Sequence, residues 1–144
     1  MKQEGKVVLV TGGGRGIGFG ISTAFAKEGA NLVITGRTES TLEEAKKKLE
    51  SAYGIKVLTV VADGADEAAI KNVISKTIET YGHLNTVVNN AQASKSGVML
   101  EDHTREDFDL AIMSGLYATF FYMREAFPYL KETKGNVINF ASGA

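Results

Sequence analysis

The chain has 144 residues, of which 44% are hydrophobic and 23% charged, an ordinary composition for a soluble globular domain. Lys and Arg number 16 against 17 Asp and Glu, so the formal net charge is -1, and we expect no nucleic-acid partner. The absence of cysteine excludes disulfides, thiolate metal sites and cysteine nucleophiles. No stretch has the length of a membrane span and no apolar leader opens the chain, so we expect a cytoplasmic protein without a membrane partner.

Five short runs rich in β-branched residues have the character of buried strands. They lie at residues 6–11, 32–35, 57–61, 87–88 and 137–140. Continuous apolar runs, rather than alternating ones, are typical of a parallel sheet that is covered on both faces. The intervals between the first four runs suit a crossover helix with two short loops. The pattern therefore predicts an α/β fold with a doubly wound parallel sheet.

Helical patterns separate the predicted strands. Leu42, Ala45 and Leu49 form one apolar stripe at helical spacing, and a second stripe from Ile70 to Ile78 follows Asp66, which we expect to cap its helix.

The last interval is longer and contains a polar loop, residues 94–104, and a helix from about 105 to 127. This helix is apolar nearly all round, so we expect burial on more than one side, against the sheet and against a second copy of the chain in a homo-oligomer. Pro128 is expected to end or kink it.

A glycine-rich turn, Thr11-Gly12-Gly13-Gly14-Arg15-Gly16-Ile17-Gly18, directly follows the first predicted strand. Glycines allow the chain to turn sharply, the backbone to approach a pyrophosphate and the helix to pack closely on the strand. The next helix would offer its N–H groups and positive dipole end to the phosphates. The G-x-G-x-x-G pattern is absent and no Walker A lysine follows. We expect nucleotide binding here rather than an ordinary strand-to-helix turn.

The order T-G-x-x-x-G-x-G resembles the short-chain dehydrogenase/reductase family, and three further segments match in order. Asp63, just past the third strand, is similar to the family aspartate that contacts adenine. Asn89-Asn90-Ala91 resembles the family's N-N-A-G at the end of the fourth strand. The segment from Gly135 to Ser142 resembles the fifth strand, which ends on the catalytic serine. With four ordered motifs across its length, the chain is identified as a member of this family.

The resemblance implies a Rossmann-like oxidoreductase that transfers a hydride between NADP(H) and a carbonyl or alcohol substrate. Ser142 would be the catalytic residue that polarises the substrate carbonyl. No metal ligand set is expected, because His83 and His103 have no partners at ligand spacing. The expected cofactor-binding residues are Gly12, Gly14, Arg15, Gly16, Ile17, Gly18, Arg37, Thr38, Asp63, Gly64, Asn90 and Ala91.

The end of the second strand favours NADP(H) over NAD(H). NAD-binding domains usually carry a carboxylate there, which accepts hydrogen bonds from the ribose hydroxyls. This chain has Gly36-Arg37-Thr38 at that point. We expect Arg37, together with Arg15 from the glycine turn, to bind the 2′-phosphate.

The chain departs from the family pattern at two positions. Gln92 stands where the family has the glycine of N-N-A-G, and Gly115 stands where many members have an asparagine in their proton relay. The family's Tyr-x-x-x-Lys pair is also missing, since none of the tyrosines begins that pattern. We therefore expect one incomplete NAD(P)-binding domain over residues 1–144, truncated after the fifth strand and inactive by itself.

An alternative is a non-catalytic dinucleotide-binding or association module. Gln92, Gly115 and the short chain favour it, whereas Ser142 at its family position speaks against it. A receiver-type signalling domain shares the α/β alternation but requires acidic residues at the end of the first strand, where this chain has Thr11-Gly12. We exclude that class.

Overall fold

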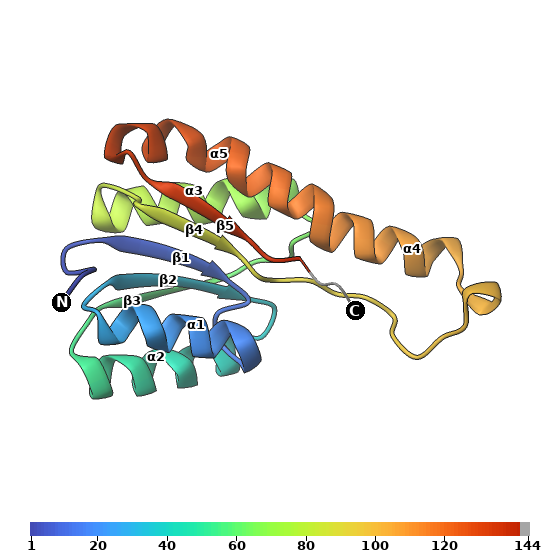
Figure 1. Cartoon of the computed structure of the whole chain (residues 1–144), viewed down its shortest axis with the longest axis horizontal. Coiled ribbons are helices and arrows are strands. Elements are labelled where there is room, and N and C mark those ends of the chain that lie inside the picture. The colour runs from blue at the N-terminus through green and yellow to red at the C-terminus, as the bar shows by residue number, and fades with distance from the viewer. Residues whose placement is uncertain (142–144) are drawn as a thin grey trace.

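The structure is a computed structural model that describes residues 1–141. Within these residues the strands are β1 (Val7–Thr11), β2 (Asn31–Gly36), β3 (Val57–Val61), β4 (Thr86–Asn89) and β5 (Asn136–Asn139). All neighbouring pairs are parallel, in the order β3-β2-β1-β4-β5 (Figure 1). The predicted α/β fold with a doubly wound parallel sheet is confirmed. The strand order reverses between β1 and β4, which in this architecture is where ligands bind.

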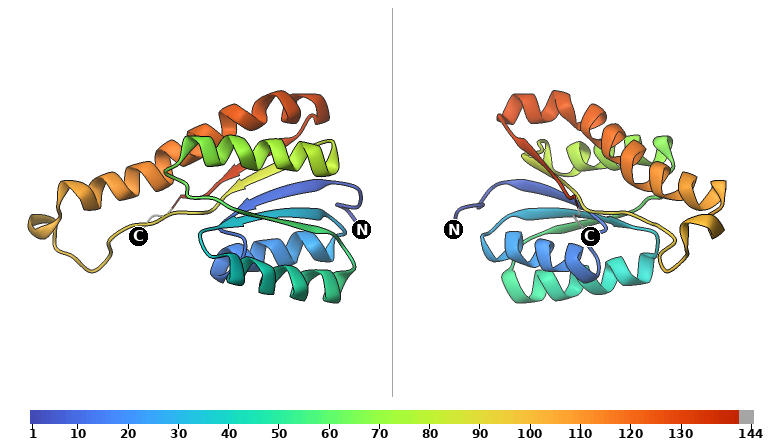
Figure 2. Two further views of the ribbon diagram at one scale, coloured as in Figure 1. Left: turned by 180° about the vertical axis from the view of Figure 1, so that it is seen from behind. Right: turned by 45° about the vertical axis from the view of Figure 1, so that its right-hand side comes forward.

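Helices cover both faces of the sheet (Figures 1 and 2). One face carries α1 (Gly16–Lys27) and α2 (Glu39–Tyr53), and the other carries α3 (Glu67–Tyr81) and α5 (Ala118–Thr133). Because successive strand residues point to opposite faces, the apolar run of β1 serves both layers. Val8 and Val10 pack with α1 and α2, and Val7 and Leu9 pack with α3 and α5. The continuous apolar runs of the sequence are explained by this double cover.

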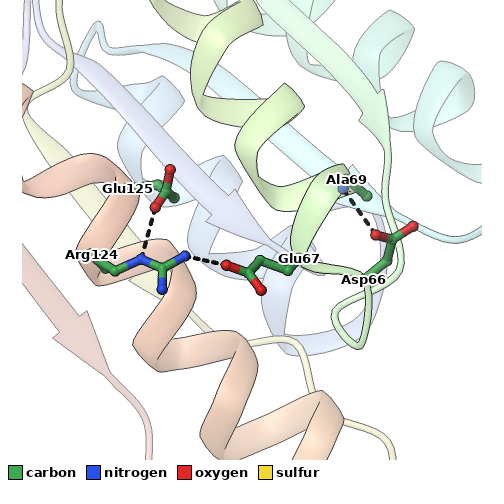
Figure 3. A network of polar contacts seen from close by, with 5 residues as sticks. All are labelled: Asp66, Glu67, Ala69, Arg124 and Glu125. Carbon is green, nitrogen blue, oxygen red and sulfur yellow. Dashed lines mark hydrogen bonds and ion pairs between the residues drawn. The ribbon is translucent and has the colours of Figure 1, made fainter.

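The two predicted apolar stripes face the sheet. Leu42, Ala45 and Leu49 are the buried residues of α2, and the stripe that begins at Ile70 provides the buried side of α3. Asp66 caps α3, since its carboxylate accepts a hydrogen bond from the Ala69 N–H at 3.2 Å (Figure 3). This prediction is therefore confirmed.

An ion-pair network connects α3 to α5 at the surface. The Arg124 guanidinium donates to the carboxylates of Glu67 and Glu125 (Figure 3) and lies over the rings of Phe120 and Phe121. The hydrogen bond from Arg124 lowers the pKa of the Glu67 carboxyl. Because these charged side chains are partly exposed to solvent, we expect the network to contribute little to stability.

The long helical segment has three parts, α4 (Arg105–Ala111), the π-helix η2 (Ile112–Tyr117) and α5. The predicted start at Arg105 is confirmed, and a capping box between Thr104 and Asp107 explains it. Of the two effects expected of Pro128, an end or a kink, the end is wrong, because α5 continues to Thr133.

Tertiary contacts hold the last turn of α5 beyond the proline. Leu130 is buried in the core, Tyr129 packs against that core, and the Thr133 hydroxyl donates to the Leu84 carbonyl at 2.8 Å. These contacts outweigh the single intrahelical hydrogen bond that Pro128 removes.

Within residues 1–141, the long helical segment is buried on one side. Ala118, Tyr122, Ala126 and Leu130 form the buried side of α5. The apolar side chains left exposed along the segment are Phe108, Leu110, Leu116, Tyr117, Phe120, Met123 and Phe127. Burial on a second side, against a partner, therefore remains a prediction.

Residues 93–111, here called the arm, project beyond the carboxyl ends of the strands (Figure 2). The arm contains a short 3-10 helix, η1 (Leu100–Asp102), and then α4. None of the helices within residues 1–141 combines the length and apolarity needed to cross a membrane.

Candidate dinucleotide-binding site

A cavity of about 550 Å³ lies at the carboxyl ends of the strands, where the strand order reverses. Every one of the predicted cofactor-binding residues lines it, although they come from four separate segments of the chain. The parallel sheet brings them together, because the loops that follow parallel strands all leave the same edge. Their binding of a cofactor remains a prediction, but their convergence on one cavity is observed.

The glycine turn forms one wall of the cavity. Gly12 has a φ of +64°, a left-handed conformation that side chains disfavour, and a Cβ atom at Gly18 would overlap the carbonyl oxygen of Gly12. The turn is therefore closed by two glycines in direct contact.

Helix α1 begins at this turn without a side-chain cap. The first N–H groups of a helix have no partner within it, and the residues that carry them, Gly16, Ile17 and Gly18, line the cavity. A helix N-terminus of this kind is suited to bind phosphate.

Thr11 fastens the end of β4 to the glycine turn. Its side-chain oxygen accepts hydrogen bonds from the N–H groups of Asn90 at 3.0 Å and Ala91 at 2.9 Å. The Asn90 side chain also donates, to the Thr11 carbonyl at 3.2 Å. Asn90 thus satisfies backbone groups between the two strands and also lines the cavity. Thr11 was not among the predicted site residues; its position at the head of the T-G motif was the available signal.

The end of β2 supplies positive charge to the cavity. Arg37 follows Gly36 directly, and Arg15 belongs to the glycine turn; both residues are exposed and line the cavity. Within residues 1–141, neither guanidinium forms an ion pair. Thr38 is the N-cap residue of α2, yet its hydroxyl makes no capping bond. All three groups are thus available to an anionic ligand.

Asp63 and Gly64 form the part of the cavity wall that follows β3. One carboxylate oxygen of Asp63 accepts from the Ala65 N–H at 2.9 Å, so the residue shapes its own turn. A Cβ atom at Gly64 would lie 3.4 Å from the Ala118 Cβ and from the Ser114 carbonyl oxygen. The turn therefore packs closely on the long helical segment.

Ser114 links two chain segments that form another part of the cavity wall. Its buried hydroxyl accepts from the Ala93 N–H at 2.9 Å and lies 2.9 Å and 2.7 Å from the carbonyl oxygens of Ala93 and Leu110. These bonds join the loop after β4 to η2. Ser114 was not among the predicted site residues; a polar residue in an apolar helical stretch was the available signal for it.

Ser142, the predicted catalytic residue, lies outside the described residues. Tyr122 lines the cavity but is buried, and burial raises the pKa of its hydroxyl to about 12. This shift disfavours proton exchange by Tyr122 near neutral pH. Within residues 1–141, no three His, Asp or Glu side chains are grouped so as to hold a metal ion.

Comparison with known sequences identifies relatives for nearly the whole chain. The family described as short chain dehydrogenase matches residues 6–144. A 12alpha-hydroxysteroid dehydrogenase of Clostridium sp. is 55% identical over 147 residues, which cover 98% of this chain and 57% of the relative. An L-fucose dehydrogenase of Bos taurus is 34% identical over a match that covers 98% of this chain and 50% of the relative. The chain thus spans about half the length of these curated relatives.

Solved structures show the same arrangement. L-sorbose reductase from Gluconobacter frateurii, complexed with NADPH and L-sorbose, superimposes with a TM-score of 0.94 at 30% identity, over 99% of this chain and 54% of that protein. A short chain dehydrogenase from Burkholderia cenocepacia in complex with NADP gives a TM-score of 0.92 at 30% identity, over 99% of this chain and 58% of that one. The chain belongs to the short chain dehydrogenase family.

Proposed function

We propose that residues 1–144 form the nucleotide-binding portion of an NADP(H)-dependent oxidoreductase that acts on a carbonyl or alcohol substrate. The observation that carries this proposal is the end of β2, where Arg37 lines the cavity and residues 36–38 include no carboxylate. A carboxylate there would repel a 2′-phosphate, whereas a guanidinium binds it with charge-assisted hydrogen bonds. The complexes of similar proteins with NADPH and NADP support the same cofactor.

The residues of the cavity fit the parts of this cofactor. Arg37, Arg15 and Thr38 would hold the 2′-phosphate, Asp63 and Gly64 the adenine, and the N-terminus of α1 the pyrophosphate. Asn90 and Ala91 would lie along the remaining half. When it is bound, the cofactor supplies the hydride to a carbonyl or accepts it from an alcohol, and Ser142 is proposed to hydrogen-bond to the substrate oxygen.

For the substrate, we propose a hydroxysteroid or its ketone. The identity of 55% to a 12alpha-hydroxysteroid dehydrogenase supports this class. The arm supports it as well, since it joins the cavity at Ala93 and Leu110 and exposes Met99, Leu100 and Phe108. Such side chains suit an apolar ring system better than a sugar.

Calorimetric titration with NADPH and NADH tests the cofactor. One charge-assisted hydrogen bond contributes about 1.5–3 kcal/mol, so NADPH should bind roughly tenfold to a hundredfold more tightly. Equal affinities, or tighter binding of NADH, would refute the proposal.

A second proposal is a non-catalytic dinucleotide-binding or association module, which the exchanges at Gln92 and Gly115 favour. An assay of the complete protein with NADPH and a panel of oxosteroids separates the two, because the module would bind NADPH without turnover.

A further inference from the structure

Gln92 and Gly115 face each other at one end of the cavity. Gln92 belongs to the loop after β4 and lines the cavity, and Gly115 lies in the π-helix η2. A Cβ atom built on Gly115 would meet one heavy atom of the described chain within 4 Å outside its own helical turn, the Cγ of Gln92, at 3.9 Å. The Gln92 side chain therefore lies over the Cα of Gly115. A Cβ alone fits there, but a longer side chain at position 115 would run into Gln92.

The contact between these two residues is held in register by their neighbours. Ser114 precedes Gly115, Ala93 follows Gln92, and the Ser114 hydroxyl is bonded to the backbone of Ala93. Because Ser114 is buried, these bonds are shielded from water and fix the loop on the helix. Positions 92 and 115 thus have a defined spacing within the chain itself.

The position of Arg37 determines which half of a dinucleotide Gln92 would meet. The pyrophosphate belongs at the glycine turn after β1, and the ribose phosphate belongs beside Arg37 at the end of β2. The sheet order places β4 on the opposite side of β1 from β2, so the other half of the ligand extends toward the loop after β4. Gln92 lies on that loop and exposes a carboxamide, which both donates and accepts hydrogen bonds.

We infer that Gln92 is a cofactor-contacting residue, that its carboxamide hydrogen-bonds to the nicotinamide half of NADP(H), and that glycine at position 115 provides the space for it. This inference rests on the proposed function and adds to it a specific contact. The two departures from the family pattern are then one paired exchange, in which a carboxamide enters the cavity from the loop while the helix position opposite loses its side chain.

The test compares two probes on the chain of residues 1–144 by calorimetry. NADPH spans the whole cavity, whereas 2′,5′-ADP carries the adenosine and its 2′-phosphate without the nicotinamide half. Gln92→Met keeps the length of the side chain and removes its hydrogen-bonding groups. We expect this variant to weaken NADPH binding by roughly threefold to tenfold, the size of one neutral hydrogen bond, and to leave 2′,5′-ADP binding unchanged.

Position 115 provides the matched pair of variants. Gly115→Ala adds only a Cβ in the available space and should preserve both affinities. Gly115→Leu should displace Gln92 and weaken NADPH as much as Gln92→Met does, and the double variant should lose less than the product of the two single effects. Retained binding of 2′,5′-ADP reports that each variant is folded.

An unchanged NADPH affinity in Gln92→Met would overturn the inference, as would an equal loss for both probes. Multiplicative effects in the double variant would show that the positions are not paired. If the unaltered chain binds neither probe, the proposed function itself fails. If it binds 2′,5′-ADP and the variants do not discriminate, only the role of Gln92 is wrong.

Discussion

Thr11 and Asn90, 79 residues apart, are joined by two hydrogen bonds, in both of which Asn90 donates and Thr11 accepts. The Thr11 side chain accepts from the Asn90 backbone, and the Asn90 side chain donates to the Thr11 backbone. Thr11 is buried, so these bonds form in a setting of low dielectric constant, where they are strong and costly to lose. The pair fixes the loop after β4 relative to the glycine turn.

Replacement of Thr11 by valine should therefore loosen the site. The N–H groups of Asn90 and Ala91 would lose their acceptor, which costs about 1–3 kcal/mol in the free energy of unfolding, and NADPH affinity should fall with it. Thr11→Ser is the matched control, because it keeps the hydroxyl and loses one buried methyl group, about 1 kcal/mol. Denaturant unfolding and calorimetry measure both effects. NADPH binding by Thr11→Val equal to that of Thr11→Ser would contradict the role of the hydroxyl.

Arg37 should determine the choice between NADPH and NADH. Arg37→Gln removes the charge, so NADPH affinity should fall by roughly tenfold to a hundredfold while NADH affinity stays within about twofold. Arg105→Gln is a suitable control, because Arg105 is an exposed arginine of α4 that pairs weakly with Asp109 and does not line the cavity. A parallel loss of both cofactors in Arg37→Gln would indicate damage to the site instead of a lost phosphate contact.

Sequence patterns predict the elements of this fold that depend on residues close together in the chain. The β-branched run 57–61 is β3 itself, and Asp66 caps α3 because its side chain acts three residues along the chain. The roles of Thr11 and Ser114 depend on partners 79 and 21 residues away, which spacing alone does not reveal. The helix end expected at Pro128 was wrong for the same reason, because contacts of Leu130 and Thr133 with residues outside the helix determine where α5 ends.

The predicted cofactor-binding residues needed more than local pattern. The glycine turn could be predicted from its own sequence, because the local backbone geometry requires its glycines. Arg37 and Asp63 come together in one site only because the parallel sheet places the ends of their strands at the same edge. The resemblance to the family had already indicated, from the sequence, that these residues belong to one site. The pairing of Gln92 with Gly115 was visible from sequence only as two separate departures.

Stability should fall at high pH because of Tyr122. Burial raises the pKa of this tyrosine in the folded state to about 12, above the value of about 10 in an unfolded chain. The unfolded state therefore releases the proton first, so the stabilising effect is complete below about pH 10 and is lost as the pH rises toward 12. Full loss amounts to about 2–3 kcal/mol. Denaturant unfolding between pH 8 and 11.5 should show the decline.

Tyr122→Phe is the control for this prediction, because it keeps the ring and removes the ionisable group. Its stability should decline less steeply over the same range. Tyr81, whose pKa burial also raises to about 12, is only half-buried and should leave a smaller slope of the same sign. Identical pH profiles for the two proteins would rule out Tyr122 as the cause.

The long helical segment should mediate self-association. Phe120, Met123 and Phe127 are exposed on one side of α5, and such a patch on a single chain marks an interaction surface. We expect residues 1–144 to sediment as a dimer or larger species, and Phe120→Ser with Met123→Lys to shift it toward monomer. Leu100→Ser is the control, since Leu100 is exposed on the arm instead. A monodisperse, cooperatively folded monomer of the unaltered chain would refute this association.

A polypeptide of these 144 residues should show no dehydrogenase or reductase activity, even where it retains nucleotide. It contains no Tyr-x-x-x-Lys sequence, the pair that the family resemblance assigns to proton transfer, and burial raises the pKa of Tyr122 to about 12, which makes this tyrosine a poor proton donor. Loss of one positioned proton-transfer group typically reduces the rate by a factor of about 10² to 10⁴. Binding should survive in part, because the phosphate turn between Gly12 and Gly18 is built within the first β-α unit.

The measurement is NADPH oxidation by mass-verified protein of this length, with a panel of oxosteroids, aldehydes and quinones. A signal above background that persists in Ser142→Ala would point to a contaminant, because it would not depend on the proposed catalytic serine. Turnover that disappears in Ser142→Ala would overturn the prediction. A second residue of this chain, or of a partner copy, would then have to supply the proton, and the groups that line the cavity near Gln92 and Ser114 would be the first to replace.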